Sequence, residues 1–109
     1  MAGIAYPVCE SQLYFGNVVK DAPTTVNLNV RNIGSEQLSI TDVTTSDATF
    51  AIGNYEKNIP ALETRSIPFT VTATAEGLIE AKATIITTGG TREVALRANC
   101  TNNITTYTI

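Results

Sequence analysis

Apolar and polar residues alternate along most of this chain, which is the pattern of a β-strand with one buried and one exposed face. Between Thr25 and Arg31, the apolar residues Val26, Leu28 and Val30 occupy every second position. The same alternation runs through three further segments: Ser66–Thr74, Leu78–Thr84 and Arg92–Cys100. No segment shows a convincing helical period, so the sequence predicts antiparallel sheets packed on one core.

Residues typical of turns separate these segments. Gly89 and Gly90 predict a tight hairpin between the last two strands, because glycine accepts a positive φ. The sequence 32–34, Asn-Ile-Gly, ends the alternating strand, and Gly77 precedes the strand that follows Thr74. These turn positions leave strands of the length that small β-domains use.

Two shorter strands are predicted at Leu38–Val43 and Thr49–Ile52. Leu38 and Ile40 share one parity and Val43 has the other, so a bulge near Thr41-Asp42 is expected. Pro68 lacks an N–H, and its position predicts a sheet edge or a bulge.

Seven or eight short strands with regular turns predict an all-β fold, an immunoglobulin-like antiparallel β-sandwich. With 109 residues, the chain has the length of one domain. We expect residues 1–100 to form the sandwich and residues 101–109 to form a β-prone C-terminal arm.

Several of these positions match a known pattern. The sequence 15–18 reads Phe-Gly-Asn-Val, 32–34 reads Asn-Ile-Gly, 60–62 reads Pro-Ala-Leu, and an alternating strand over 67–73 precedes Gly77. In these features the chain resembles the ASH family of immunoglobulin-like domains, relatives of the major sperm protein fold. It departs from the pattern at Val71 and Ala73, where the family commonly has an aromatic residue and then proline. The resemblance implies a binding or scaffolding module without a shared catalytic residue.

Charge and hydropathy exclude several classes of partner. The formal net charge is −3, only 16% of residues are charged, and no basic stripe is present, so nucleic-acid binding is not expected. No apolar run approaches the roughly 20 residues that span a bilayer. The segment Met1–Val8 has no basic residues and is interrupted by Pro7, so no export signal is predicted. We expect synthesis in the cytoplasm, with incorporation into a virion as one destination.

Candidate chemistry is sparse. The chain has no histidine, which removes triads, histidine bases and most zinc sites, and we expect no catalytic residue, metal or cofactor. Asp42 and Asp47 in a Thr-rich loop could suit calcium but fit no EF-hand spacing, and solvated carboxylates are the favoured interpretation. If the first strand pairs parallel with the last, Cys9 and Cys100 lie at opposite ends of that strand and stay free.

The candidate contact residues are uncharged side chains on arms and strand faces. In the C-terminal arm they are Ile104, Tyr107 and Ile109, and elsewhere they are Tyr14, Thr70, Thr72 and Thr74. An arm of this kind can add to a neighbour's sheet edge, or it can fold back as an extra strand on its own sandwich. The N-terminal segment Ile4–Val8 could also contact a neighbour. The three threonines form either a docking face or an ordinary solvated sheet face.

These observations predict a non-enzymatic, structural protein-interaction module. Its partner would be a protein, either a large symmetric assembly or a second copy of itself. The most concrete form is a multicopy accessory subunit, such as a phage capsid-decoration or other virion protein, by analogy with other small β-sandwich subunits. The alternatives are a surface or periplasmic adhesion or carbohydrate-binding module and a cytoskeletal or ciliary targeting module.

Overall fold

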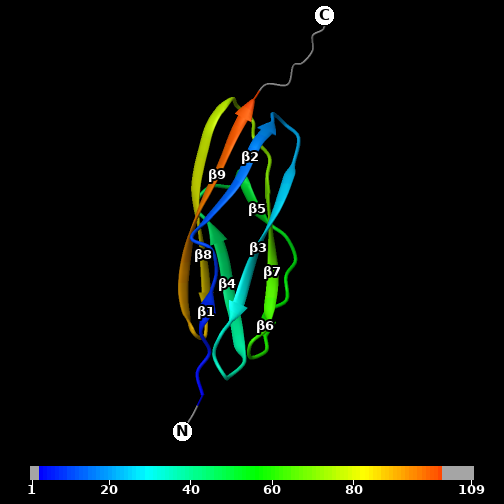
Figure 1. Ribbon diagram of the computed structural model, residues 1–109. Helices are drawn as coiled ribbons and strands as arrows, with labels where there is room; N and C mark the ends of the chain where they lie inside the picture. Colours follow the sequence, from blue (N-terminus) through cyan, green and yellow to red (C-terminus); the bar gives the residue numbers. More distant parts are fainter. Residues whose placement is uncertain (1–2, 102–109) are drawn as a thin grey trace, which may run out of the picture.

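The computed structural model describes residues 3–101, which form two β-sheets packed face to face (Figure 1). The four-stranded sheet has the order β1 (Pro7–Val8), β3 (Thr24–Asn32), β7 (Thr64–Val71) and β5 (Phe50–Ile52). The five-stranded sheet has the order β2 (Gln12–Val19), β9 (Gly90–Thr101), β8 (Gly77–Thr87), β4 (Leu38–Thr45) and β6 (Asn58–Ile59). The predicted immunoglobulin-like sandwich is confirmed.

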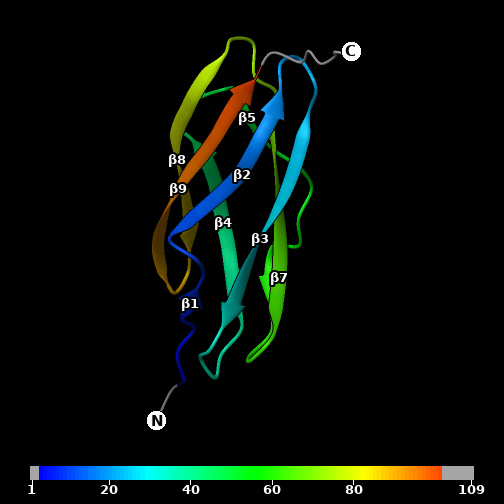
Figure 2. The same cartoon turned by 45° about the horizontal axis from the view of Figure 1, so that its top comes forward.

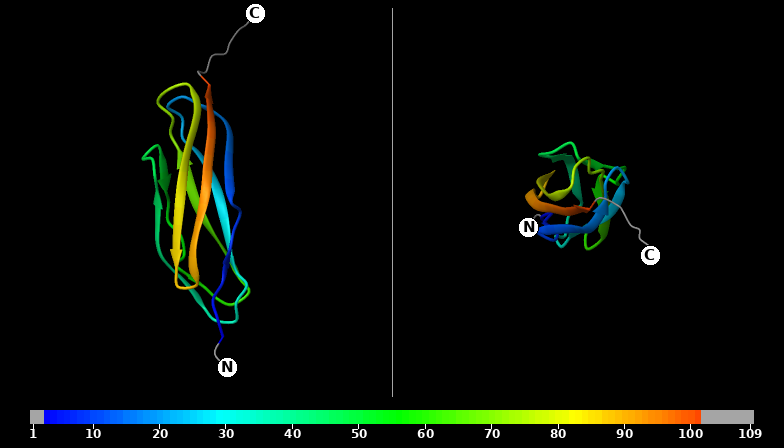
Figure 3. Two further views of the ribbon diagram at one scale, coloured as in Figure 1. Left: turned by 90° about the vertical axis from the view of Figure 1, so that its left-hand side faces the viewer. Right: turned by 90° about the horizontal axis from the view of Figure 1, so that it is seen from above.

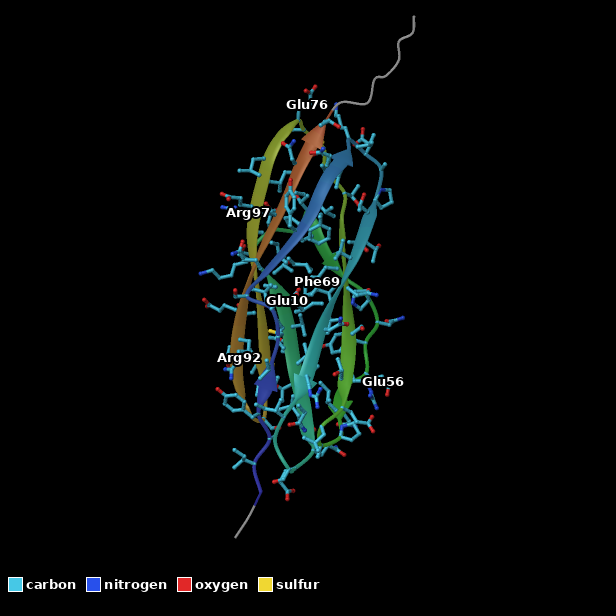
Figure 4. The ribbon with its side chains drawn as sticks, viewed as in Figure 1. Glu10, Glu56, Phe69, Glu76, Arg92 and Arg97 are labelled. Carbon is cyan, nitrogen blue, oxygen red and sulfur yellow. The ribbon has the colours of Figure 1, made fainter. Side chains whose placement is uncertain are left out.

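The core consists of the inward-facing residues that the alternation predicted. Ile67, Phe69 and Val71 of β7 are fully buried, and the ring of Phe69 lies between the sheets in Figure 4. On the facing sheet the inward residues of β9 are likewise buried: Val94, Leu96, Ala98 and Cys100. Each strand therefore contributes one face to a single apolar layer, which is the main source of stability in such a sandwich.

The chain changes sheets near its beginning. β1 pairs antiparallel with the end of β3, and the chain then crosses to the other sheet, where β2 runs parallel to β9. Gln12 is aligned with Ala95, and Val18 is aligned with Cys100. Cys9 precedes β2 and so lies toward the beginning of β9. Both thiols are free, as the register argument predicted.

Two bulges interrupt the ladders. The predicted bulge in β4 is present, because the register with β8 shifts between Ile40 and Asp42. A second one in β2 shifts the register with β9 between Tyr14 and Asn17, and Gly16 there has a φ of 76°. A positive φ is strained for residues with a Cβ, which explains a glycine at this position.

The hairpin between β8 and β9 corrects part of the turn prediction. Gly90 has a positive φ of 132°, but Gly89 does not have one. Gly89 instead lies so close to the carbonyl of Ala5 that a Cβ would collide with it. Its small size serves a close approach of the N-terminal segment rather than the turn.

The N-terminal segment Ile4–Val8 lies against its own sandwich, and its contact with a neighbour stays a prediction. Its carbonyl groups at Ile4 and Tyr6 accept hydrogen bonds from the N–H groups of Glu36 and Ile33, both at 3.0 Å. We call residues 3–8 the N-terminal strap, because they lie along the end of their own sandwich. The strap and the end of β9 are at opposite ends of the elongated body (Figure 3).

Candidate docking surfaces

The outer face of the five-stranded sheet is crossed by ion pairs. A nitrogen of Arg97 lies 2.8 Å from a carboxylate oxygen of Glu80, and Lys82 lies 3.4 Å from Glu93. All four side chains are more than half exposed, and Arg97 extends outward from this sheet in Figure 4. A partner that covered this face would have to remove water from paired charges, which is costly.

The outer face of the four-stranded sheet has the opposite character. Thr25 and Thr70 share a hydroxyl–hydroxyl hydrogen bond of 2.7 Å across β3 and β7, and the Ser66 hydroxyl donates to the side-chain oxygen of Asn29 at 2.6 Å. The segments that build this part of the sheet, 25–29, 49–54 and 66–72, contain no charged residue. We call their outward side the neutral face.

The structure places only some of the predicted contact residues together. Thr70 is half-buried on the neutral face, and Thr72 and Thr74 are exposed immediately beyond the end of β7. Tyr14 is 61% exposed, but it is aligned with Arg97 on the other sheet and so lies on the charged face. The remaining candidates, Ile104, Tyr107 and Ile109, lie outside the described residues.

Asn32 is a structural residue whose importance the sequence prediction missed. Its side chain is fully buried, and its oxygen accepts hydrogen bonds from the N–H groups of Tyr6 (3.2 Å) and Gly34 (2.9 Å). Its NH2 group donates to the carbonyl groups of Glu36 (2.7 Å) and Ile59 (3.0 Å). Asn32 continues the inward parity of Val26, Leu28 and Val30, so a polar residue in a core position was the available signal.

Exposed apolar side chains gather at the end of the sandwich that carries the strap. Ile4 is 65% exposed, Leu62 63% and Ile33 49%. The guanidinium of Arg92 lies 5.0 Å from the centre of the Tyr6 ring and donates to the Pro7 carbonyl at 3.1 Å. These contacts fix the strap without covering its apolar residues.

The carboxylates that could have suggested metal or acid–base chemistry have local partners. Oδ1 of Asp42 accepts from the N–H of Val43, and Oδ1 of Asp47 accepts from the N–H of Thr49, both at 2.9 Å. The bond from Thr49 lowers the pKa of Asp47. Among residues 3–101 no three potential metal ligands cluster and no pocket is found.

Two further carboxylates, Glu76 and Glu80, lie near the beginning of β8. Glu80 is paired with Arg97, and Glu76 lies at the turn before β8, at the top of Figure 4. In the described part of the chain there is also no helix with the length and apolarity to cross a membrane.

Comparison with known proteins places the domain in a family. A model of the HYDIN/CFA65/VesB-like, Ig-like domain matches residues 8–100. The ASH/PapD-like domain 7 of human CEP192 superimposes with a TM-score of 0.75 at 8% identity, covering 92% of this chain and 87% of its own. This likeness bears out the resemblance to ASH domains.

Two longer bacterial proteins contain a similar domain. A protein of unknown function from Porphyromonas gingivalis W83 has a TM-score of 0.78 at 17% identity, over 88% of this chain and 47% of that protein. The secreted serine protease VesC of Vibrio cholerae has a TM-score of 0.66 at 16% identity, over 87% of this chain and 23% of the protease. The present chain thus spans less than half of either protein. No curated protein matches the sequence.

Proposed function

The chain belongs to the HYDIN/CFA65/VesB-like, Ig-like domain family, and on that premise we propose that it is a non-enzymatic protein-interaction module that docks through its neutral face. Domains of this class generally mediate protein interactions and are generally non-catalytic. The function therefore depends on which surface a partner covers.

The observation that carries the proposal is the contrast between the two outer faces. On one face, four charged side chains are arranged in two ion pairs. On the other, hydroxyl and amide side chains already satisfy one another, as in the Thr25–Thr70 and Asn29–Ser66 pairs. Interface cores are depleted in charged residues, because desolvating a charge costs more than burying a hydrogen-bonded polar group.

We assign the partner contact to Thr70 and Thr72 on the neutral face, to Thr74 just beyond it, and to Ile104, Tyr107 and Ile109 in the C-terminal segment. Threonine side chains on a sheet face offer methyl groups as well as hydroxyls, so they can pack against a second sheet. The apolar residues of the C-terminal segment supply the larger side chains that the neutral face lacks. Tyr14 lies on the opposite face and would contact a second partner surface.

For the place where the protein acts, we favour an exported module over a virion subunit. The similar domain of VesC belongs to a secreted protease, and this supports the surface or periplasmic alternative. The similarity to an ASH/PapD-like domain of human CEP192 is compatible with an interaction module and does not distinguish between these settings. The virion role rests on analogy with small β-sandwich subunits. Cell fractionation of the native source tests the choice, because an exported module is recovered with envelope or secreted material.

Thr72→Lys tests the neutral face directly. Thr72 is exposed beyond the end of β7, so lysine there leaves the fold intact but places a charge where a partner would have to desolvate it. We expect a several-fold lower recovery of the partner that co-purifies from the native source, measured by quantitative mass spectrometry.

Thr91→Lys is the matched control, because Thr91 is exposed on the charged side of the molecule, aligned with Ile86. This variant should recover the partner as well as the unmodified protein does. Equal recovery with both lysine variants would show that the neutral face is an ordinary solvated surface.

A further inference from the structure

The edge of the four-stranded sheet is only partly covered. β1 pairs with β3 at Asn32 and Arg31, and within residues 3–101 no strand pairs with that side of β3 above this point. The uncovered side of β3 runs upward in Figure 2 to the turn that joins it to β2. A strand edge of this kind presents unpaired N–H and C=O groups that can bind another strand.

The pairing with β7 identifies the backbone groups at this edge. Asn27 is aligned with Pro68, whose carbonyl accepts a hydrogen bond from Gly53 at 2.9 Å and therefore faces β5. Pro68 and Asn27 thus form a non-hydrogen-bonded pair, and the N–H and C=O of Asn27 point away from β7. Because the direction alternates, Thr25 and Asn29 present their N–H and C=O groups on the same free side.

Three other strand borders carry features that hinder strand addition. β7 is an inner strand rather than the edge strand that Pro68 suggested, because β5 pairs with it at residues 69–71; just beyond that pairing Pro68 has no N–H to donate. β2 is interrupted by the bulge at Gly16, and β5 has three residues. The stretch of β3 from Thr25 to Asn29 has no proline, bulge or charge. It lacks the common protections of an exposed edge.

The core is also less covered beside this stretch. Leu28 and Val30 of β3 are completely buried, whereas Val26 is only partly buried although it packs against the same core. An added strand would place its inward side chains beside Val26. The edge therefore combines unpaired backbone groups with apolar surface, the two features that strand addition uses.

The sequence of residues 102–109 suits this edge. It contains no charged side chain, proline or glycine, and it has three large apolar residues: Ile104, Tyr107 and Ile109. Eight residues extend about 26 Å and the five-residue edge about 16 Å, at roughly 3.3 Å per residue. Thr101 ends β9 beside β2, and its carbonyl accepts from the N–H of Lys20 at 3.2 Å.

The same geometry favours a segment from another molecule. To reach the edge of its own β3, the segment would have to reverse direction immediately after Thr101 and cross β2 to the other sheet. A reversal takes about four residues and leaves too few to pair along the edge. A segment from a second copy has no such constraint.

We propose that residues Asn102–Ile109 of a second copy of this chain add as a strand to the free edge of β3 between Thr25 and Asn29. The inference rests on the proposed docking function and names the partner and the surface. Backbone hydrogen bonds at Thr25, Asn27 and Asn29 hold the added strand, and its apolar side chains cover Val26.

Asn27→Pro is the decisive variant, since the N–H of Asn27 bonds to no residue of its own sheet and proline already occupies the aligned position 68. Asn27→Lys is its matched control, because it changes the side chain but keeps the N–H at the edge. In sedimentation equilibrium of the full chain, we expect concentration-dependent self-association that Asn27→Pro weakens roughly ten-fold and Asn27→Lys weakens much less.

A variant of the added segment tests the other partner of the contact. Replacing Ile104, Tyr107 and Ile109 together by serine should reduce self-association as Asn27→Pro does. Ile4→Ser is the control, because Ile4 is 65% exposed at the opposite end of the sandwich, and self-association should persist. If Ile4→Ser abolishes self-association while the triple serine variant keeps it, the proposal is overturned.

Hydrogen exchange of the unmodified chain tests strand addition at the β3 edge even if a variant fails to fold. The amides of Thr25, Asn27 and Asn29 should exchange more slowly as protein concentration rises. If these amides are protected equally at low and high protein concentration, the segment pairs with the edge of its own molecule. If they stay unprotected in a sample that has associated, the contact lies elsewhere. Either result would overturn the proposal. A chain that stays monomeric at all concentrations would overturn this inference. The proposed docking to another protein would still be tested separately by the recovery of the partner with Thr72→Lys.

Discussion

The side chain of Asn32 joins four backbone segments at one end of the sandwich. It binds the strap through Tyr6, the following turn through Gly34 and Glu36, and β6 through Ile59. An amide can donate and accept two hydrogen bonds each, and all four are made here. A buried residue of this kind fixes the relative positions of loops that no strand ladder connects.

Asn32→Ala should therefore destabilise the domain strongly. It leaves two N–H and two C=O groups without their partner, each costing about 1–3 kcal/mol where water cannot replace it. We expect a loss of about 3 kcal/mol in the free energy of unfolding and a fall in Tm of about 13 °C, measured by thermal denaturation. Asn58→Ala is the control, because Asn58 is exposed and should change stability by less than about 0.5 kcal/mol. Equal effects would refute the special role of Asn32.

Cys9 gives the stability a dependence on alkaline pH. Burial raises the pKa of its thiol, an effect that the nearby Arg92 partly opposes. In the unfolded chain the thiol loses its proton at lower pH than in the folded protein, so stability is full below the ordinary thiol pKa and falls as pH rises above about 9.

This pH dependence can be measured by comparing the free energy of unfolding of the unmodified protein with that of Cys9→Ala between pH 8 and about pH 10. The free energy of unfolding of the unmodified protein should fall more steeply than that of the variant, in which this thiol is absent. All other ionisable side chains are the same in the two proteins, so the difference between the two curves reports the Cys9 thiol. Parallel curves would show that the Cys9 thiol titrates alike in the folded and unfolded states.

At the scale of elements, the N-terminal strap depends on small residues in the loops that it crosses. A Cβ at Gly34 would collide with the carbonyl of Ile4, and one at Gly89 with that of Ala5. The strap is held chiefly by backbone hydrogen bonds, including those from Ile33 to Tyr6 and from Glu36 to Ile4. Displacing it would expose the lower part of the β3 edge as well.

Gly34→Ala should release the strap while the two sheets stay folded. We expect the amides of Ile33 and Glu36 to exchange with solvent at least several-fold faster, because they lose their acceptors in the strap. In Gly16→Ala, the control, nothing lies within 4 Å of the new Cβ, but the φ of 76° costs about 1–2 kcal/mol. If the control accelerates the same two amides equally, the effect reflects general destabilisation.

The elements that the sequence predicted well are those with a long alternating pattern. In β7 and β9 the period of two extends over eight residues or more, so both strand and buried face follow from it. β1 and β6 have two residues each and are too short to show any period. Their positions depend on partners distant in sequence, Arg31–Asn32 for β1 and Leu38–Ser39 for β6.

The positions of the candidate contact residues could likewise be predicted only in part from the sequence. Alternation predicts correctly that Tyr14 and Thr72 point outward. It does not say that Tyr14 lies on the charged face and Thr70 on the neutral face, because the sheet to which a strand belongs is set by long-range pairing. The domain boundary at residue 100 stays a prediction, with β9 extending to Thr101.

At the scale of the whole molecule, charge is distributed unevenly over a body with a net charge of −3. Two copies repel each other at long range, and added salt screens that repulsion. If the two copies meet through an uncharged surface, their contact contains no attractive ion pair that added salt could weaken. The salt dependence of association therefore reports which face of the sandwich is used.

Raising sodium chloride from about 0.05 to 0.5 M, which shortens the screening length from over 10 Å to a few ångströms, should leave the dissociation constant for self-association unchanged or lower it modestly. Sedimentation equilibrium at the two salt concentrations measures this. Thr72→Lys provides an internal comparison, because a lysine on the neutral face reduces the net negative charge and so should weaken the salt dependence. A ten-fold weaker association in high salt would place the interface on the face that carries the Glu80–Arg97 and Lys82–Glu93 pairs, where ions compete with a partner's charges.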